Sequence, residues 1–244
     1  MIEHGIQEVI SMKRMMIVMA AMMTGVPVFA AEGPWTSKAG LGYLSSTGNL
    51  ESTSVNGTLD VGYKVGRWTH ELGLLALGSQ AEGVTTAERY SLGYQAKWAI
   101  HDYDYAFAGL NYDKDKISSV EQSLSETFGY GRRLIKNAVQ ELNAEIGVGY
   151  RQQDFVDGTD DSSAIVRLAG DYLYNISDTS NFTQTLAIEI GGDNTSTIAV
   201  SKLNTKIRDA LSLVLGFTVN NNSDVPGGFE KTDTFTSVNL EYVF

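Results

Sequence analysis

The last nine residues of the chain, 236–244, alternate between two kinds of side chain, and this pattern constrains the fold more than any other segment. Side chains alternate across a β-strand, so residues two positions apart share a face. One face is apolar and ends on the terminal residue: Val238, Leu240, Tyr242 and Phe244. The other is polar: Ser237, Asn239 and Glu241. The chain is therefore expected to end in an amphipathic strand.

A terminal strand of this kind resembles the closing strand of a bacterial outer-membrane β-barrel. In that class of protein, the terminal aromatic residue and the alternating residues before it form the signal that the barrel-assembly machinery reads. The resemblance implies that the four residues of the apolar face are an assembly signal. The alternative is an ordinary half-buried strand, so the rest of the chain has to carry the same pattern.

From residue 35 onward, segments of about ten alternating residues are separated by polar or Gly-rich breaks. The clearest alternation lies at 89–98, 142–151 and 211–220. Further segments lie at 35–45, 54–64, 68–78, 103–113, 122–133, 163–174, 181–190, 196–206 and 231–244. Each strand with its connection takes about 18 residues, a length that suits transmembrane strands. An even number of strands also returns both termini to the same side of the membrane. The sequence predicts an all-β protein, a single antiparallel transmembrane β-barrel of about twelve strands.

The breaks alternate between short and long, as expected for short periplasmic turns and longer outer loops. Short breaks lie near 65–67, 100–102, 134–137, 175–180 and 207–209, and longer ones near 79–86, 114–121, 152–162 and 221–230. Basic residues cluster around the short breaks: Lys64, Arg67, Arg132, Arg133, Lys136, Lys206 and Arg208. Acidic residues cluster around the long ones: Asp113, Asp115, Glu121, Asp154, Asp157, Asp160, Asp161, Asp224 and Glu230.

Two soluble folds could share the alternation: a β-sandwich, or a ligand-binding barrel with its apolar face inward. Glycines and opposite charges on the polar faces favour a filled lumen instead. Aromatic residues also recur near strand ends, as membrane-interface girdles do; they are Trp35, Tyr63, Trp68, Trp98, Tyr103, Tyr150 and Tyr174. A helical membrane protein is disfavoured because no run of 18 apolar residues occurs after residue 31.

The N-terminus has the features of an export signal. Lys13 and Arg14 precede an apolar stretch, and the small residue Ala30 follows it, which predicts a signal peptide at 12–30. Residues 1–11 carry acid ahead of the positive region, which is unusual, so we interpret them as a non-native extension. The mature barrel is then expected to span 31–244 and to lie in the bacterial outer membrane.

Catalysis is poorly supported. Only His70 and His101 fall in the expected mature chain, and neither has a Ser placed convincingly beside it. An outer-membrane lipid hydrolase, which would need a Ser–His pair, is therefore the least favoured function. The acidic loop 154–161 lacks the spacing of a calcium loop and is expected to be solvated, although divalent ions could bridge it to lipopolysaccharide phosphates. No cofactor and no bound metal are expected, and the chain has no cysteine.

Charged residues on the polar faces are the strongest functional lead. A basic residue that faces lipid at mid-depth costs roughly 2–4 kcal/mol, so these charges must line water or pair with each other. They are Asp60, Glu71, Arg89, Lys97, Glu145, Arg151, Arg167, Asp171 and Glu189. A narrow aqueous pore and a salt-bridged plug remain equally open. In the segment 103–133 the register conflicts, because Glu126 shares a face with Phe128 and Tyr130, and a β-bulge would resolve this.

Four motifs together resemble the YdiY-like family of salt-induced outer-membrane proteins, whose domain has no known function. They are Gly40–Leu50, Asn111–Asp115, Phe128–Gly131 and Thr232–Thr234 leading to the terminal Phe. The likeness spans nearly all of residues 35–244. It implies an outer-membrane barrel and transfers no catalytic residue.

We expect a narrow, weakly selective pore or an envelope component linked to salt or osmotic stress. The alternative from another class is a closed structural or surface-interaction barrel. The expected partners are outer-membrane lipid, lipopolysaccharide, the barrel-assembly machinery and periplasmic chaperones. The net charge of −11 argues against nucleic acid as a partner.

Overall fold

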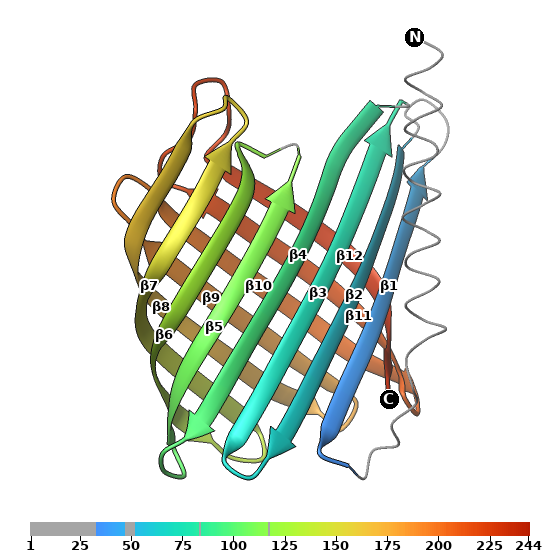
Figure 1. The fold of residues 1–244 in the computed structure, drawn as a ribbon. Helices are drawn as coiled ribbons and strands as arrows, with labels where there is room; N and C mark the ends of the chain where they lie inside the picture. Colours follow the sequence, from blue (N-terminus) through green and yellow to red (C-terminus); the bar gives the residue numbers. More distant parts are fainter. Residues whose placement is uncertain (1–32, 47–51, 83, 117) are drawn as a thin grey trace.

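The computed structural model describes residues 33–46, 52–82, 84–116 and 118–244, which form one closed barrel of twelve strands (Figure 1). The strands are β1 Trp35–Ser46, β2 Ser52–Val65, β3 Trp68–Ala81, β4 Val84–Ala99, β5 Asp104–Asp115, β6 Val120–Lys136, β7 Gln140–Phe155, β8 Asp160–Ser177, β9 Ser180–Ile190, β10 Thr195–Arg208, β11 Leu211–Asn222 and β12 Thr232–Val243. All twelve coincide with the strands expected from the sequence, so the predicted fold class is confirmed. The expected signal peptide at 12–30 and the extension at 1–11 lie outside the described residues.

Each strand pairs antiparallel with its neighbours in the chain, and β12 pairs with β1 to close the barrel. This closing seam is short: Lys38–Leu41 face Leu240–Val243. The backbone amide of Phe244 adds a hydrogen bond to the carbonyl of Ser37, at 2.9 Å. The first strand starts and the last strand ends at the lower end of the barrel in Figure 1, which is the periplasmic end for this topology.

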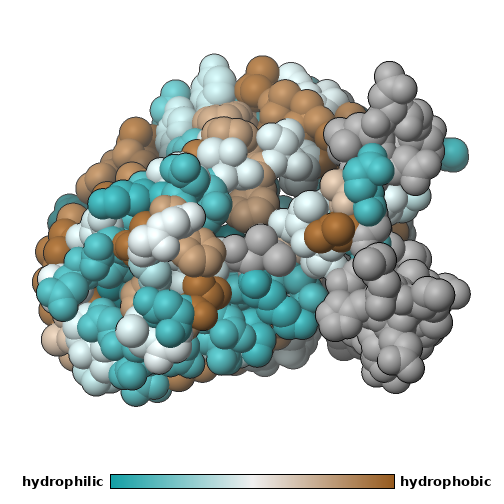
Figure 2. All heavy atoms as spheres, turned by 90° about the horizontal axis from the view of Figure 1, so that it is seen from above, coloured by the Kyte–Doolittle hydropathy of each residue, from teal (hydrophilic) through white to brown (hydrophobic). Residues whose placement is uncertain are grey.

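The apolar faces of the strands point outward. Phe128, Ile146 and Leu240 are 63%, 55% and 50% exposed, whereas the inner-face residues Arg151 and Glu145 are 1% and 6% exposed. Seen from above, hydrophobic residues lie around much of the periphery and hydrophilic residues gather toward the viewer's end (Figure 2). Both soluble alternatives bury the apolar face, and both are therefore wrong. The protein is a transmembrane barrel of the bacterial outer membrane, whose lipid supplies the missing apolar surroundings. Within the described ranges, no helix has the length and apolar character needed to cross a membrane.

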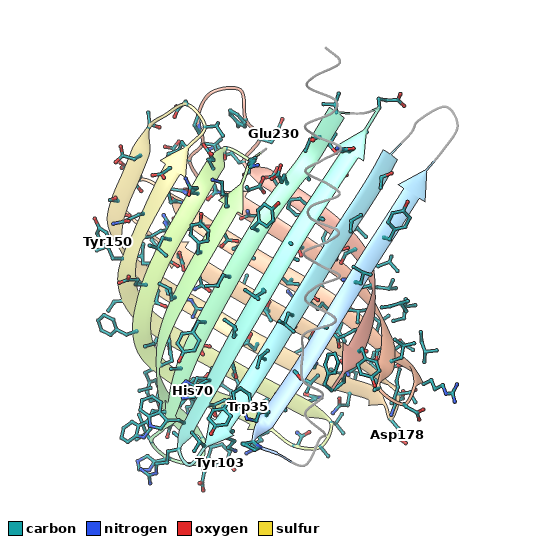
Figure 3. All side chains as sticks on the ribbon, turned by 45° about the vertical axis from the view of Figure 1, so that its right-hand side comes forward. Trp35, His70, Tyr103, Tyr150, Asp178 and Glu230 are labelled. Atoms are coloured by element: carbon teal, nitrogen blue, oxygen red, sulfur yellow. The ribbon has the colours of Figure 1, made fainter. Side chains whose placement is uncertain are left out.

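Aromatic residues gather on the outer face near the periplasmic ends of the first four strands. The Trp35 and Tyr63 rings are 4.2 Å apart, and the Trp68 and Trp98 rings are 6.4 Å apart. Figure 3 shows Trp35, His70 and Tyr103 at this lower end, with Tyr150 higher on the outside of the barrel. The placement matches an interfacial girdle, where an aromatic ring has one apolar and one wet side.

The outer connections are shorter than the sequence predicted. The prediction of long loops near 79–86, 114–121 and 152–162 is wrong, because β3 and β4 are joined through 82–83 and β7 and β8 through 156–159. Polar residues in these segments continue the strand ladder, as where Gln152 pairs with Ser162 and Asp154 with Asp160. Their polar composition suggests a loop, yet these residues are paired as β-strand. The connection 223–231 does remain long.

The suspected β-bulge near Glu126 is absent from the described pairing of β6. Irregularities lie instead at the two ends of the strand, at Val120/Gln122 and Arg133/Ile135. Glu126 keeps its place on the outer face, opposite Leu110 and Tyr150. The alternation was therefore right as it stood, and this carboxylate faces outward at the level of Tyr150.

Candidate functional site

The strand register places all nine charged residues of the predicted set on the inner face. Three ion pairs lie within the set: Arg167–Glu145 at 2.8 Å, Lys97–Glu71 at 2.8 Å and Arg151–Glu189 at 3.7 Å. A fourth joins Arg89 to Asp113, which is not in the set, at 2.9 Å. Asp60 and Asp171 line cavities of the lumen. The structure therefore places seven of the nine residues in ion pairs along the lumen and leaves Asp60 and Asp171 outside them.

Glu145 of β7 is the centre of a network inside the lumen that joins four strands of the wall. Its carboxylate accepts hydrogen bonds from Arg167 Nη1 of β8 at 2.8 Å and from the Tyr105 hydroxyl of β5 at 3.0 Å. It also accepts from Gln95 Nε2 of β4 at 3.1 Å. Because β4 and β7 are three strands apart in the barrel, these side chains span part of the bore. We call Gln95, Tyr105, Phe107, Glu145 and Arg167 the partition.

Two inward aromatic rings fill the space beside this network. Tyr105 and Phe107 are 3% and 4% exposed. The Arg167 guanidinium lies 5.7 Å from the Phe107 ring centroid, and the Lys97 ammonium lies 5.6 Å from that of Tyr105, both within the range of cation–π attraction.

Glycines on β6 and β7 make room for these rings. A Cβ at Gly131 would collide with the Tyr105 ring, and one at Gly147 would meet Phe107 Cζ at 3.0 Å. The sequence analysis missed Gln95, Tyr105 and Phe107. The signal that could have revealed them is the run of inner-face glycines at 129, 131, 147 and 149, which implies large side chains opposite.

Replacing Gly131 with Ala is expected to destabilise the barrel, because the new methyl group would force the buried Tyr105 ring to move. Overpacking of this kind typically costs about 1–3 kcal/mol. The matched control is Gly73→Ala, also on the inner face, where the nearest atom is Asp60 Oδ1 at 3.4 Å. Urea unfolding in detergent micelles measures both variants, and equal midpoints would contradict the packing of Tyr105 against Gly131.

The lumen contains two chambers, and two residues of the partition line them: Arg167 lines both and Gln95 lines one. The outer chamber has a volume of about 340 Å³ and is lined by Arg89, Asp113, Asp171 and Glu189, among others. The inner chamber has a volume of about 520 Å³ and is lined by residues that include Lys38, Asp60 and Glu71. Arg167 and Asn111 line both. The two chambers therefore meet at Arg167, which belongs to the partition, and at Asn111.

Polar contacts hold the wall of the outer chamber where β9 ends early. β9 stops at Ile190, opposite Val166, so the stretch of β8 above Val166 lacks a partner on that side. Arg151 reaches into this place and donates to the carbonyls of Asn194 at 2.6 Å and Glu189 at 3.2 Å. The Arg151 guanidinium thus provides hydrogen bonds at the place where the β8–β9 pairing has ended.

The histidines do not form a hydrolase-like pair. His70 lies on the outer face, and its Nδ1 is 2.8 Å from the Tyr94 hydroxyl. His101 lies in the β4–β5 turn. The described residues contain no cluster of three or more His, Cys, Asp or Glu side chains arranged to hold a metal ion. In the acidic loop, Asp157 instead accepts hydrogen bonds from the Thr159 amide and hydroxyl, which lower the pKa of its carboxyl.

The comparisons with known proteins agree with this geometry. A family model described as "Protein of unknown function, DUF481" matches residues 39–244. Over 214 residues, the chain is 25% identical to uncharacterized protein YdiY of Escherichia coli strain K12, covering 87% of this chain and 84% of YdiY. The resemblance to the YdiY-like family is thereby confirmed.

Two solved structures share the fold. An outer membrane channel from Pseudomonas putida F1, named COG4313, aligns with a TM-score of 0.51 and 12% identity, covering 89% of this chain and all of the channel. The NanC porin aligns with a TM-score of 0.50 and 11% identity, covering 86% and 98%. At these identities the likeness shows the outer-membrane barrel fold alone.

Proposed function

Because the chain belongs to the DUF481 family of proteins of unknown function, its role has to be inferred from its own lumen, and we propose that it is a narrow, weakly selective pore for small ions. The observation that carries this proposal is the pair of polar chambers that meet at Arg167 and Asn111. The partition narrows the bore with side chains and not with a plug of backbone. Side chains of this kind can rearrange while the barrel itself stays fixed. The porin and channel folds that the chain resembles support the same function.

The charges of the lumen predict weak ion preference. The nine predicted residues comprise four bases and five acids, and seven of them belong to ion pairs, so the charge of this set nearly cancels. Acidic residues near the outer mouth, including Asp115 and Asp233, would raise the local concentration of cations there. A slight preference for cations follows.

The reversal potential of the refolded barrel in a planar bilayer under a KCl gradient tests this preference. We expect a small potential of the sign that indicates K⁺ preference, fading near 1 M salt, where screening acts within about 3 Å. Shortening Arg89 to Ala should increase the preference, because it leaves Asp113 without its partner at 2.9 Å. Strong anion selectivity would contradict the proposed distribution of charge.

A closed structural barrel is the second candidate, and the partition is the observation that favours it. If the contacts of Glu145 persist, they block ion flow, and the outer surface would then carry the function. A barrel that is shown to be folded but does not conduct would support this candidate. We further propose that either form serves the envelope under salt or osmotic stress, on the basis of the family resemblance.

A further inference from the structure

We propose that the periplasmic mouth of the barrel holds a binding site for a small polyanion that carries phosphate or carboxylate groups. A hollow of about 800 Å³ lies between the β2–β3 turn, the β4–β5 turn and the end of β6. Its charged lining residues are Lys64, Arg67, Asp102, Arg133 and Lys136, and His101 also lines it. The site is distinct from the two chambers and does not require an open lumen.

Backbone hydrogen bonds tie the three segments into one frame. The amide of Ala99 donates to the carbonyl of Arg67 at 2.9 Å, which joins the β2–β3 turn to the end of β4. The amide of Arg133 donates to the carbonyl of Tyr103 at 2.8 Å, which joins β6 to the β4–β5 turn. Arg133 Nη1 also donates to the carbonyl of Asp102 at 3.0 Å, which orients its guanidinium. The basic groups thus surround a site that is already formed.

Most bases deeper in the lumen are paired, whereas the bases of this hollow are not paired within the described residues. Lys38, Arg89, Lys97, Arg151 and Arg167 each have a carboxylate oxygen within 4.0 Å. Across the described part of the chain, the four bases of the hollow have no such partner. The four bases and the single acid of the lining, Asp102, give the hollow a net charge of +3. An arrangement of this kind attracts anions, and arginine side chains suit the planar geometry of phosphate and carboxylate oxygens.

The register indicates that the ligand comes from the periplasm rather than from lipid. Lys64 and Arg133 lie opposite Thr69 and Asn143 on the inner face of their strands. Of the girdle residues, the outward-facing Trp68 and Trp98 are not among the lining residues, whereas Tyr103 is. A free anion can reach this side of the turns directly, whereas a phospholipid headgroup would have to leave the bilayer edge.

Isothermal titration calorimetry tests the site on the refolded barrel in uncharged detergent micelles, with tripolyphosphate as the probe. We expect saturable binding that weakens with added salt. Replacing Arg133 and Lys136 together by Gln should weaken it by about tenfold, since two charged contacts are lost. The matched control is Lys202→Gln with Lys206→Gln, which removes the same charge from β10 outside the hollow and should change the affinity by about twofold at most.

Several outcomes would overturn the proposal. If the two double variants weaken tripolyphosphate binding equally, the anion is attracted by net charge and not by the hollow. If the binding curve does not saturate, the barrel has no defined site. If the hollow binds phosphatidylglycerol in the micelles and does not bind tripolyphosphate, the surface would be assigned to lipid. Gel mobility without heating verifies that each variant is folded, and Arg67→Gln, in an exposed turn, provides a second variant. The heat of binding does not depend on ion conduction. The binding test therefore remains valid even if the barrel proves not to be a pore.

Discussion

Deleting Phe244 is expected to lower the amount of barrel in the outer membrane several-fold and to increase periplasmic degradation. The residue terminates the short seam in which Lys38–Leu41 pair with Leu240–Val243. Its ring packs edge-on against Tyr242, with centroids 4.9 Å apart, and its amide bonds to Ser37. Deletion removes these contacts together with the terminal aromatic group that we expect the assembly machinery to read. Quantitative immunoblots of outer-membrane and periplasmic fractions measure the effect.

Glu241→Gln is the matched control on the opposite face of the same strand. Glu241 is 8% exposed, accepts a hydrogen bond from Asn204 at 3.4 Å and lies 3.9 Å from Lys38. Glutamine keeps an acceptor for Asn204 and leaves the apolar face intact, so the yield should fall much less. Membrane yields that are equal for the wild type, the control and the deletion would contradict an assembly signal at Val238, Leu240, Tyr242 and Phe244.

Replacing Arg167 and Glu145 together by Ala is expected to raise the single-channel conductance by about twofold or more, because two side chains that occupy the bore are removed. Both side chains belong to the partition, and Arg167 lines both chambers, so their removal is expected to widen the passage between the chambers. Removing both also avoids the penalty of about 3–5 kcal/mol for leaving one buried charge without its partner. Conductance in planar bilayers measures the change.

The control for this experiment removes an ion pair that lies outside the lumen. Lys116 and Glu88 are 2.5 Å apart near the outer end of β4, and the Lys116 side chain is 48% exposed. Replacing both by Ala should leave the conductance close to that of the wild type. If this control raises conductance as much as the partition variant does, the partition does not limit flow.

The fold could be predicted from the sequence because the decisive pattern is local. In β7, Leu142, Ile146 and Val148 alternate with Glu145 and Arg151, and the structure places the two groups on opposite faces. A period of two assigns a face to each residue without knowledge of its neighbours. The same pattern placed Glu126 outward correctly, and no bulge was needed there.

The partition could not be predicted because it depends on which side chains meet across the lumen. Gln95 and Glu145 are 50 positions apart and come from β4 and β7. Their contact is set by strand stagger and barrel curvature, which the alternation does not encode. Tyr105 and Phe107 point inward on a strand whose outward neighbours, Ala106 and Ala108, are small. An aromatic ring on the polar face looks like an exception to the pattern, although here it fills the bore.

The single-channel conductance of the refolded wild-type barrel in a planar bilayer tests the central claim most directly. The account predicts small, discrete current steps, because the two chambers meet at Arg167, whose side chain is hydrogen-bonded to Glu145 inside the bore. Steps should become larger in the Arg167/Glu145 double variant. Folded protein that inserts into the bilayer and gives no steps, as wild type or as this variant, would contradict the pore and leave the closed barrel.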